Sequence, residues 1–165
     1  MNELTALANK YGSDKGSLKH NYTEHYFKYL EPYKRLPVHL FEIGVDKGAS
    51  IKMWLDFLPD AFITGLDLLP CPECLISAGR YTHVQGSQIV VDDLRSVGVC
   101  CIIIDDGSHN YADIFYTLGV MAVMTNCDLY FVEDLGAKRA GNAMADLKRY
   151  GFKELAPQLA VKEFV

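Results

Sequence analysis

The sequence predicts an α/β fold built on a doubly wound, mostly parallel sheet. From about residue 38 onward, apolar strand-like segments alternate with segments of helical spacing, an order typical of a sheet covered by helices on both faces. The two clearest strand candidates, residues 100–106 and 128–134, are apolar runs that end in acidic pairs. Strands that are buried on both faces have such continuous apolar runs.

The first half of the predicted sheet follows from apolar runs and helix stops. Residues 38–45 form an apolar run with a glycine near its end, as expected of a buried parallel strand. Residues 50–58 have helical spacing of apolar side chains, and Pro59 stops the helix. Residues 62–68 are expected to form a second strand, followed by a segment rich in proline and cysteine, and residues 82–86 a short third strand.

The second half repeats the same alternation. Residues 88–98 are a plausible third helix, and residues 100–106 are the clearest strand of the chain. Residues 112–124 are apolar enough to form a helix that covers the sheet, and residues 128–134 are the next strand. A last helix near 142–150 and one or two short terminal strands complete the prediction.

Length and composition favour one compact domain. The chain has 165 residues, half of them apolar, which is enough to bury a core. Residues 1–35 differ from the rest, because they predict two short helices around a polar loop that precede the sheet as an appendage. We expect this appendage to lie over the active site and residues 36–165 to form the core.

Charge and hydropathy argue against two classes of partner. The net charge of −5 comes without any dense run of lysine and arginine, so a nucleic-acid backbone is not the expected partner. No apolar run reaches the roughly 18 to 20 residues that cross a bilayer, and the first residues do not resemble a targeting signal. We therefore expect a cytoplasmic protein that does not bind membranes, and leave open whether it forms a homo-oligomer.

The cysteines do not predict a zinc site or a disulfide framework. Five cysteines are an odd number, which excludes a fully paired framework. Cys71 and Cys74 form a lone C-x-x-C, and no second pair or histidine is suitably spaced for zinc. We expect this pair to lie in a loop at the solvent edge.

The first strand-to-helix turn carries the pattern E-x-G-x-x-x-G, formed by Glu42, Gly44 and Gly48. Glycines permit a tight turn and let a ligand approach the backbone closely. Asp46 stands where a dinucleotide-binding turn would have its middle glycine, and a carboxylate there would repel a pyrophosphate. The turn therefore favours a nucleoside over a dinucleotide.

Further polar residues follow the second, third and fourth strands. Asp67 lies 23 positions beyond Gly44, where an acid can accept hydrogen bonds from ribose hydroxyls. At the end of the third strand, Gln85, Ser87 and Gln88 are expected to line the base pocket. Asp105 is counted with this cofactor-binding set. It is not expected to share a site with Asp106, because adjacent side chains of an extended chain point to opposite faces.

Acidic residues at two strand ends predict a metal site. Asp106 ends the fourth strand, and Glu133 and Asp134 end the fifth. Carboxylates that converge repel one another unless a cation neutralises them, and hard oxygen ligands suit magnesium, with manganese or calcium as alternatives. His109 could face the same space as a base, because the imidazole of histidine exchanges protons near neutral pH. A single acid at a strand end is more often a helix cap or a solvated residue, but two acidic pairs beside a histidine favour a site.

Four segments together resemble a known family. They are GSDKGSLKHNYTEHYFKYL, LFEIGVDKGASIKMWLDFLPDAFITGLDL, IIIDDGSHNY and YFVEDL, and they resemble the macrocin and mycinamicin sugar O-methyltransferases. The resemblance covers residues 10 to about 135. It implies a class I, Rossmann-like methyltransferase fold with a short helical N-terminal appendage, and an enzyme that uses S-adenosylmethionine (SAM) and magnesium to methylate sugar hydroxyls of macrolides.

The resemblance also implies roles for individual residues. It implies that the metal is held by three acids, Asp106, Glu133 and Asp134. It implies that His109 is the general base, and we count Asp106 with it as catalytic. The residues implied near SAM come from the first two strand ends and from the S-D-K-G loop: Glu42, Gly44, Asp67, Ser13, Asp14, Lys15 and Gly16. Three further residues match the family pattern, with packing roles left open: His20, Tyr22 and Tyr26.

The chain departs from the family pattern in three places. One is the segment Thr125-Asn126-Cys127, which stands where the family has two glycines before the fifth strand. Ser87 stands where the family has an acid, which puts the adenine contact in doubt. Only 31 residues follow Asp134, so the C-terminal end is abbreviated and the macrolide itself is not carried over as the substrate. The expected acceptor is a hydroxyl group of a small molecule, a sugar or a glycosylated natural product.

Three alternatives stay open at this point. The chain could be a SAM- or nucleoside-binding module without turnover, although such a module needs neither metal nor base. It could be a nicotinamide-dependent oxidoreductase on a similar sheet, against which Asp46 argues. It could also keep the fold and the metal but methylate a catechol-type acceptor.

Overall fold

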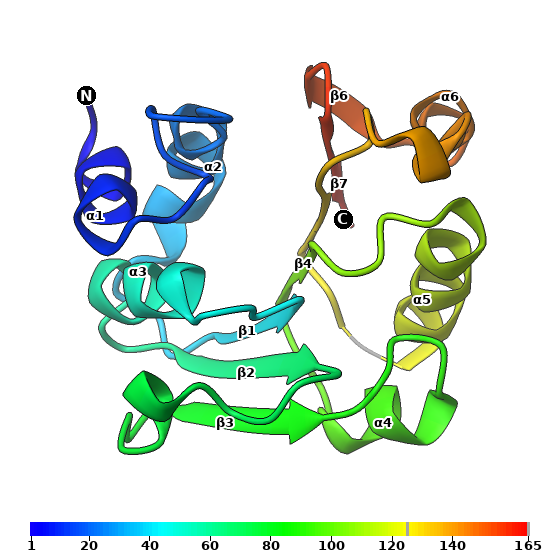
Figure 1. The fold of residues 1–165 in the computed structure, drawn as a ribbon. Helices are drawn as coiled ribbons and strands as arrows, with labels where there is room; N and C mark the ends of the chain where they lie inside the picture. Colours follow the sequence, from blue (N-terminus) through cyan, green and yellow to red (C-terminus); the bar gives the residue numbers. More distant parts are fainter. Residues whose placement is uncertain (125, 165) are drawn as a thin grey trace.

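A computed structural model describes residues 1–124 and 126–164 of the chain. In this described part, the strands form one seven-stranded sheet in the order β3-β2-β1-β4-β5-β7-β6 (Figure 1). Their bounds are β1 His39–Ile43, β2 Phe62–Asp67, β3 Tyr81–Gln85, β4 Ile102–Asp105, β5 Leu129–Val132, β6 Lys153–Ala156 and β7 Leu159–Glu163.

The first five strands are parallel, and the last two are not. β1 pairs with β2 on one side and β4 on the other, so the strand order reverses between them. β7 inserts between β5 and β6 and is antiparallel to both. The doubly wound, mostly parallel sheet predicted from the sequence is therefore confirmed, and the place of β7 is an addition to it.

The helices divide between the two faces of the sheet (Figure 1). One face carries the N-terminal helices and the helix after β1, and the other carries the helices that follow β3, β4 and β5. The helices are α1 Glu3–Tyr11, α2 Thr23–Leu30, α3 Ala49–Phe57, α4 Val91–Ser96, α5 Tyr111–Met124 and α6 Ala143–Arg149. Short 3-10 turns are η1 Glu31–Tyr33, η2 Glu73–Leu75 and η3 Lys138–Ala140. Among the described residues, no helix is both long and apolar enough to span a bilayer.

Alternation along the strands produces two apolar cores. Leu40 of β1 packs with the α1–α3 side, and its neighbour Phe41 packs with the α4–α6 side. In β4, Ile102 and Ile104 belong to the first core and Ile103 to the second. Successive strand side chains point to opposite faces, so a strand buried on both faces needs the continuous apolar run that the sequence shows.

The N-terminal helices are tied to the core by packing and capping. Asn2 caps α1 by accepting a hydrogen bond from the Thr5 backbone N–H at 2.8 Å. Gly12 ends the helix in the left-handed conformation, with φ 73°, a backbone geometry that glycine adopts without strain. Leu4 and Tyr26 are fully buried in the α1–α3 core. The chain between α1 and α2 thereby returns to the carboxyl ends of the strands.

Four of the first five strands are shorter than the sequence predicted, whereas β3 is shifted by one residue, and the difference matters for the site. The pairing of β1 stops at Ile43 and that of β4 at Asp105. Gly44 and Asp106 therefore lie in the turns just beyond the sheet. The predicted third helix over residues 88–98 is restricted to Val91–Ser96.

Candidate cofactor cleft and acidic centre

A cleft opens where the strand order reverses, the usual ligand position of an open α/β sheet. It consists of a cavity of about 490 Å³ on the side of the N-terminal segment and one of about 330 Å³ on the side of β3. Gly44, Asp67 and Gly107 line both cavities, so the two lie side by side. Seven of the residues that the sequence places at the cofactor line the cleft, two of them in both cavities and five in one: Gly44 and Asp67, then Ser13, Asp14, Lys15, Ser87 and Gln88.

The glycine turn after β1 brings two loops into close contact. Gly44 has φ 86°, and a Cβ atom there would lie 2.1 Å from the carbonyl oxygen of Asp106. Asp46, in the same turn, is a non-glycine residue with φ 44°, which is uncommon outside functional or strained turns. The turn can therefore hold only glycine at residue 44 without moving the loop after β4.

Asp67 is fixed by the backbone around it. Its Oδ2 accepts hydrogen bonds from the N–H groups of Val45 at 2.7 Å and Asp46 at 3.0 Å, and its Oδ1 accepts one from Leu69 at 2.9 Å. Burial alone would raise the pKa of this carboxyl, but the backbone donors lower it below the usual value. An ionised carboxylate has about four acceptor positions, so Asp67 retains acceptor capacity toward a hydroxyl group in the cleft.

Gln88 supports the loop after β4. It is 7% exposed, and its Nε2 donates to Asp105 Oδ1 at 3.3 Å and to Thr117 Oγ1 at 3.1 Å. Its Oε1 accepts a hydrogen bond from the Ser108 backbone N–H at 2.6 Å. Although Gln88 lines the smaller cavity, its amide is already engaged in shaping it.

Five residues assigned to the cofactor or implied near it do not line either cavity: Gly16, Glu42, Gly48, Gln85 and Asp105. Gly48 caps α3, and a Cβ there would lie 2.7 Å from Leu75. Gln85 is exposed, and its side chain donates to the Leu68 carbonyl oxygen. For these two residues, packing and hydrogen bonding at the end of an element explain the sequence pattern without a ligand.

Asp105 needs the same correction. Its side chain is 2% exposed, and Tyr130 and Gln88 donate hydrogen bonds to it. Burial raises the pKa of this carboxyl to about 7. As predicted from the extended chain, it points away from Asp106, but this places it inside the α4–α6 side of the fold, behind Gln88 and Gly107, which line the smaller cavity.

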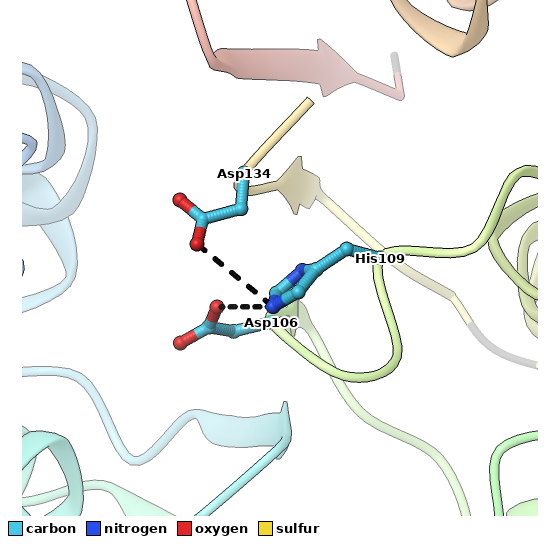
Figure 2. Close-up of side chains that lie close together, drawn as sticks. All are labelled: Asp106, His109 and Asp134. Carbon is cyan, nitrogen blue, oxygen red and sulfur yellow. Dashed lines mark ion pairs between the residues drawn. The ribbon is translucent and has the colours of Figure 1, made fainter. Parts of the chain in front are cut away.

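Asp106, His109 and Asp134 meet at the acidic centre (Figure 2). His109 Nε2 lies 3.9 Å from Asp106 Oδ1 and 3.8 Å from Asp134 Oδ2. One ligand atom of each residue lies within 4.8 Å of the others. His109 and Asp134 have positive φ values of 54° and 52°, so the backbone bends sharply at both positions. The ends of β4 and β5 are thus neighbours, as the acidic pairs led us to expect.

Lys15 reaches this centre from the N-terminal segment. Its Nζ lies 3.0 Å from both carboxylate oxygens of Glu133, 3.5 Å from Glu42 Oε1, and donates a short hydrogen bond to Asp106 Oδ2. Burial alone would lower the pKa of Lys15, but the three carboxylates raise it well above the usual value. Lys15 is therefore an ammonium ion that is 1% exposed. The sequence suggested only that it lies near the cofactor.

Two tyrosines of the N-terminal segment also bind the acidic residues. Tyr22 donates a hydrogen bond to Asp134 Oδ1 at 3.0 Å, and Tyr26 donates one to Glu133 Oε1 at 2.5 Å. The sequence left packing roles open for both. Tyr26 combines the two roles, because its ring packs on Trp54 and Phe131 while its hydroxyl holds an acid.

The residues of the acidic centre fit a hard divalent cation. Four carboxylates gather there: Glu42, Asp106, Glu133 and Asp134. Among the residues that the structure describes, Lys15 is the only lysine or arginine paired with them. Glu42 Oε1 is buried without a hydrogen bond, and burial raises the pKa of Glu133 well above its usual value. This excess of negative charge and oxygen donors is what a magnesium or manganese ion would offset.

The strand order and the cleft at its reversal define the class of the chain, which has the class I methyltransferase fold. A solved structure with this fold is the methyltransferase MycE of the mycinamycin biosynthetic pathway, in complex with Mg, SAH and mycinamycin VI. The two superpose with a TM-score of 0.85 and 25% sequence identity, over 98% of this chain and 54% of that one. No family model matches the sequence.

Sequence relatives confirm the resemblance to sugar O-methyltransferases. The chain is 33% identical over 147 residues to 8-demethyl-8-(2-methoxy-alpha-L-rhamnosyl)-tetracenomycin-C 3'-O-methyltransferase of Streptomyces olivaceus, covering 81% of this chain and 37% of that protein. It is 30% identical over 145 residues to mycinamicin VI 2''-O-methyltransferase of Micromonospora griseorubida, covering 81% and 36%. The chain thus spans little more than a third of the length of the curated relatives that it matches.

Proposed function

We propose that the chain is an enzyme that transfers the methyl group of SAM to a hydroxyl group of a small molecule, with the help of a divalent cation. The observation that carries this proposal is the juxtaposition of two sites in one cleft. Gly107 lines both cavities, and it lies between Asp106 and His109 of the acidic centre. A nucleoside cofactor in the cleft would therefore lie beside a base and a cluster of acids.

The two cavities differ in a way that suits SAM. The smaller one has exposed apolar side chains, Leu68 and Ile89, on which a flat base can pack. The larger one is lined by charged side chains, including Asp14, Lys19 and Lys47, which suit the charged amino-acid end. Asp67, between them, would accept hydrogen bonds from the ribose hydroxyls. Asp46 in the turn argues against a pyrophosphate, and thus against a nicotinamide dinucleotide.

The acidic centre supplies the chemistry on the acceptor side. In this proposal Asp106, Glu133 and Asp134 would hold magnesium or manganese. A divalent cation, when bound, lowers the pKa of a hydroxyl group beside it. His109 Nε2 then accepts the hydroxyl proton, and the oxygen forms a bond to the methyl carbon while the bond from that carbon to sulfur breaks. The products are the methyl ether and S-adenosylhomocysteine, SAH.

The acceptor class is taken from the relatives. Their names describe methylation of sugars attached to tetracenomycin, mycinamicin and oleandolide. We accordingly propose a sugar or a glycosylated natural product as the acceptor, and a single methyltransferase domain in which residues 1–35 lie over the active site. The contacts of Lys15, Tyr22 and Tyr26 with the acids support that last point.

A methyl-transfer assay tests the proposal. The chain is incubated with methyl-labelled SAM and a panel of rhamnosides, other deoxysugar glycosides and catechols, with Mg²⁺ or with EDTA. The expected result is labelled sugar product that requires Mg²⁺ and is lost in Asp106→Asn but kept in Asp92→Asn, a control on exposed α4. Full activity in EDTA would contradict the metal-dependent part, and preferential labelling of catechols would contradict the sugar acceptor.

A further inference from the structure

Lys15 belongs to a polar loop, yet its ammonium group is buried at the end of the sheet. It is 91 residues from Asp106 and 118 from Glu133 in sequence. Its side chain is 1% exposed, and its Nζ lies among three carboxylates. Burying a charge is costly unless it is paired, so the position of Lys15 depends on the acids that surround it.

Lys15 and the metal-binding set use the same carboxylates. The two oxygens of Asp106 are divided, because Oδ2 accepts from Lys15 and Oδ1 faces His109. Both oxygens of Glu133 lie at 3.0 Å from Lys15 Nζ, and Oε1 also accepts from Tyr26. Both oxygens of Glu133 therefore contact the ammonium group of Lys15, whereas Asp106 Oδ1 faces His109 instead.

We propose that Lys15 is a tethered counter-cation that competes with the divalent cation for Asp106 and Glu133 and thereby sets the affinity of the site. This inference rests on the proposed function. A divalent cation that approaches Glu133 would be repelled by the ammonium group, because both oxygens of this carboxylate lie at 3.0 Å from Lys15 Nζ. Glu133 becomes a metal ligand when the ammonium group leaves it, and until then Asp106 Oδ1 and Asp134 are the accessible carboxylate donors.

Replacement of the ammonium group by a divalent cation also involves the chain around Lys15. The loop from residue 13 to residue 22 is held together by its own backbone hydrogen bonds, from His20 N–H to Asp14 O at 3.0 Å and from Asn21 N–H to Gly16 O at 2.9 Å. Ser13, Lys15 and Lys19 line the larger cavity. Departure of the ammonium group would thus loosen one wall of the cofactor cleft, which couples cation binding to cofactor access.

Calorimetric titration with Mg²⁺ and Mn²⁺ tests the competition. Lys15→Met keeps the aliphatic length and removes the charge, and we expect it to bind the cations at least about tenfold more tightly than the unaltered chain. The control is Lys19→Met, which removes a charge from the same loop and cavity without a carboxylate contact, and which should change the affinity much less. Unchanged or weaker binding by Lys15→Met would overturn the inference.

A second measurement needs no variant and guards against misfolding of Lys15→Met. Amide hydrogen exchange of residues 13–22 in the unaltered chain should become faster at saturating Mg²⁺, while exchange in β1 stays the same. Unchanged or slower hydrogen exchange in residues 13–22 would overturn the proposal that Lys15 competes with the divalent cation. If neither the unaltered chain nor Lys15→Met bound a divalent cation, the metal in the proposed function would be contradicted. If the two bound the cation with equal affinity, only the proposed competition by Lys15 would be contradicted.

Discussion

His109 has a position that allows two roles. Its Nε2 is nearly equidistant from Asp106 and Asp134, so the same nitrogen could accept a proton or bind the cation. The first role is the one we propose, because the surrounding acids are sufficient oxygen donors. A nitrogen that binds the cation could not also accept the proton, so the two roles give different outcomes on substitution.

The first prediction concerns His109→Ala. Loss of a general base lowers turnover by about 10²–10⁴-fold, and we expect this loss with unchanged affinity for SAM and for Mg²⁺. Steady-state kinetics and calorimetry measure the three quantities, with His25→Ala on α2 as the control. Wild-type turnover of His109→Ala would contradict the role of His109 as the general base. A large loss of Mg²⁺ affinity in this variant would show that His109 binds the cation instead.

The second prediction concerns Asp105. The unfolded chain releases this proton near a pKa of about 4, and the folded chain near about 7. The raised pKa means that the protonated Asp105 carboxyl stabilises the folded state. This contribution to the free energy of unfolding is complete below about pH 4 and is lost as the pH rises through about 7. Asp105→Asn keeps the acceptor for Gln88 and cannot ionise, so its advantage in melting temperature should grow from about pH 5 to about pH 8, reaching about 3 °C or more.

Thermal unfolding at the two pH values measures this advantage. Asp92→Asn is the matched control, because Asp92 is exposed on α4 and its substitution should shift the melting temperature equally at both values. A variant of Asp105 that is equally stabilised at both values, or is less stable at the higher one, would contradict the account of a buried carboxyl.

At the scale of elements, the turn after β1 is tightly constrained by the loop after β4. A methyl group on Gly44 would collide with the Asp106 carbonyl oxygen, and its φ of 86° is unfavourable for other residues. We expect Gly44→Ala to lower stability by more than about 1 kcal/mol and to weaken SAH binding, because the two loops must separate.

Gly98→Ala is the control for that substitution. Gly98 also has a positive φ, of 76°, but a Cβ added there would meet no atom within 4 Å. Gly98→Ala should therefore lose only the stability that alanine loses at a positive φ, as measured by chemical denaturation. Calorimetry should show that it binds SAH normally. Equal effects of the two substitutions would show that the contact with Asp106 is unimportant.

The sequence predicts elements better than it predicts contacts between them. The proximity of the two acidic pairs could be predicted, because both follow apolar strands and parallel strands place their carboxyl ends at one edge of the sheet. The contact of Lys15 with Glu133 could not be found in this way, because it depends on how a loop outside the sheet folds back over it. Similarly, Gly48 fits a ligand-binding pattern in sequence but packs against Leu75.

At the scale of the whole molecule, alternation of apolar runs was sufficient to predict the sheet and its two helical layers. It could not give the order of the strands, since the placement of β7 between β5 and β6 depends on long-range pairing. The strand order nevertheless determines where the cleft lies, because it places β1 and β4 side by side at the reversal.

The whole molecule should be stabilised by the cation that its acids would hold. A ligand that binds only the folded state raises stability by about 2.7 kcal/mol at a concentration of about 100 Kd. We expect saturating Mg²⁺ to raise the melting temperature of the chain and to have little effect on Asp134→Asn. A differential scanning measurement in which K⁺ at equal ionic strength gives the same rise would contradict specific binding.

The most direct test of the central claim is calorimetric titration of SAH, with NADH as the competing nucleotide, against the unaltered chain and Asp67→Ala. We predict that SAH binds at one site per chain, that Asp67→Ala weakens it by about tenfold or more, and that NADH does not displace it. Tight NADH binding, or SAH binding that is indifferent to Asp67, would contradict the assignment of this cleft to the methyl donor.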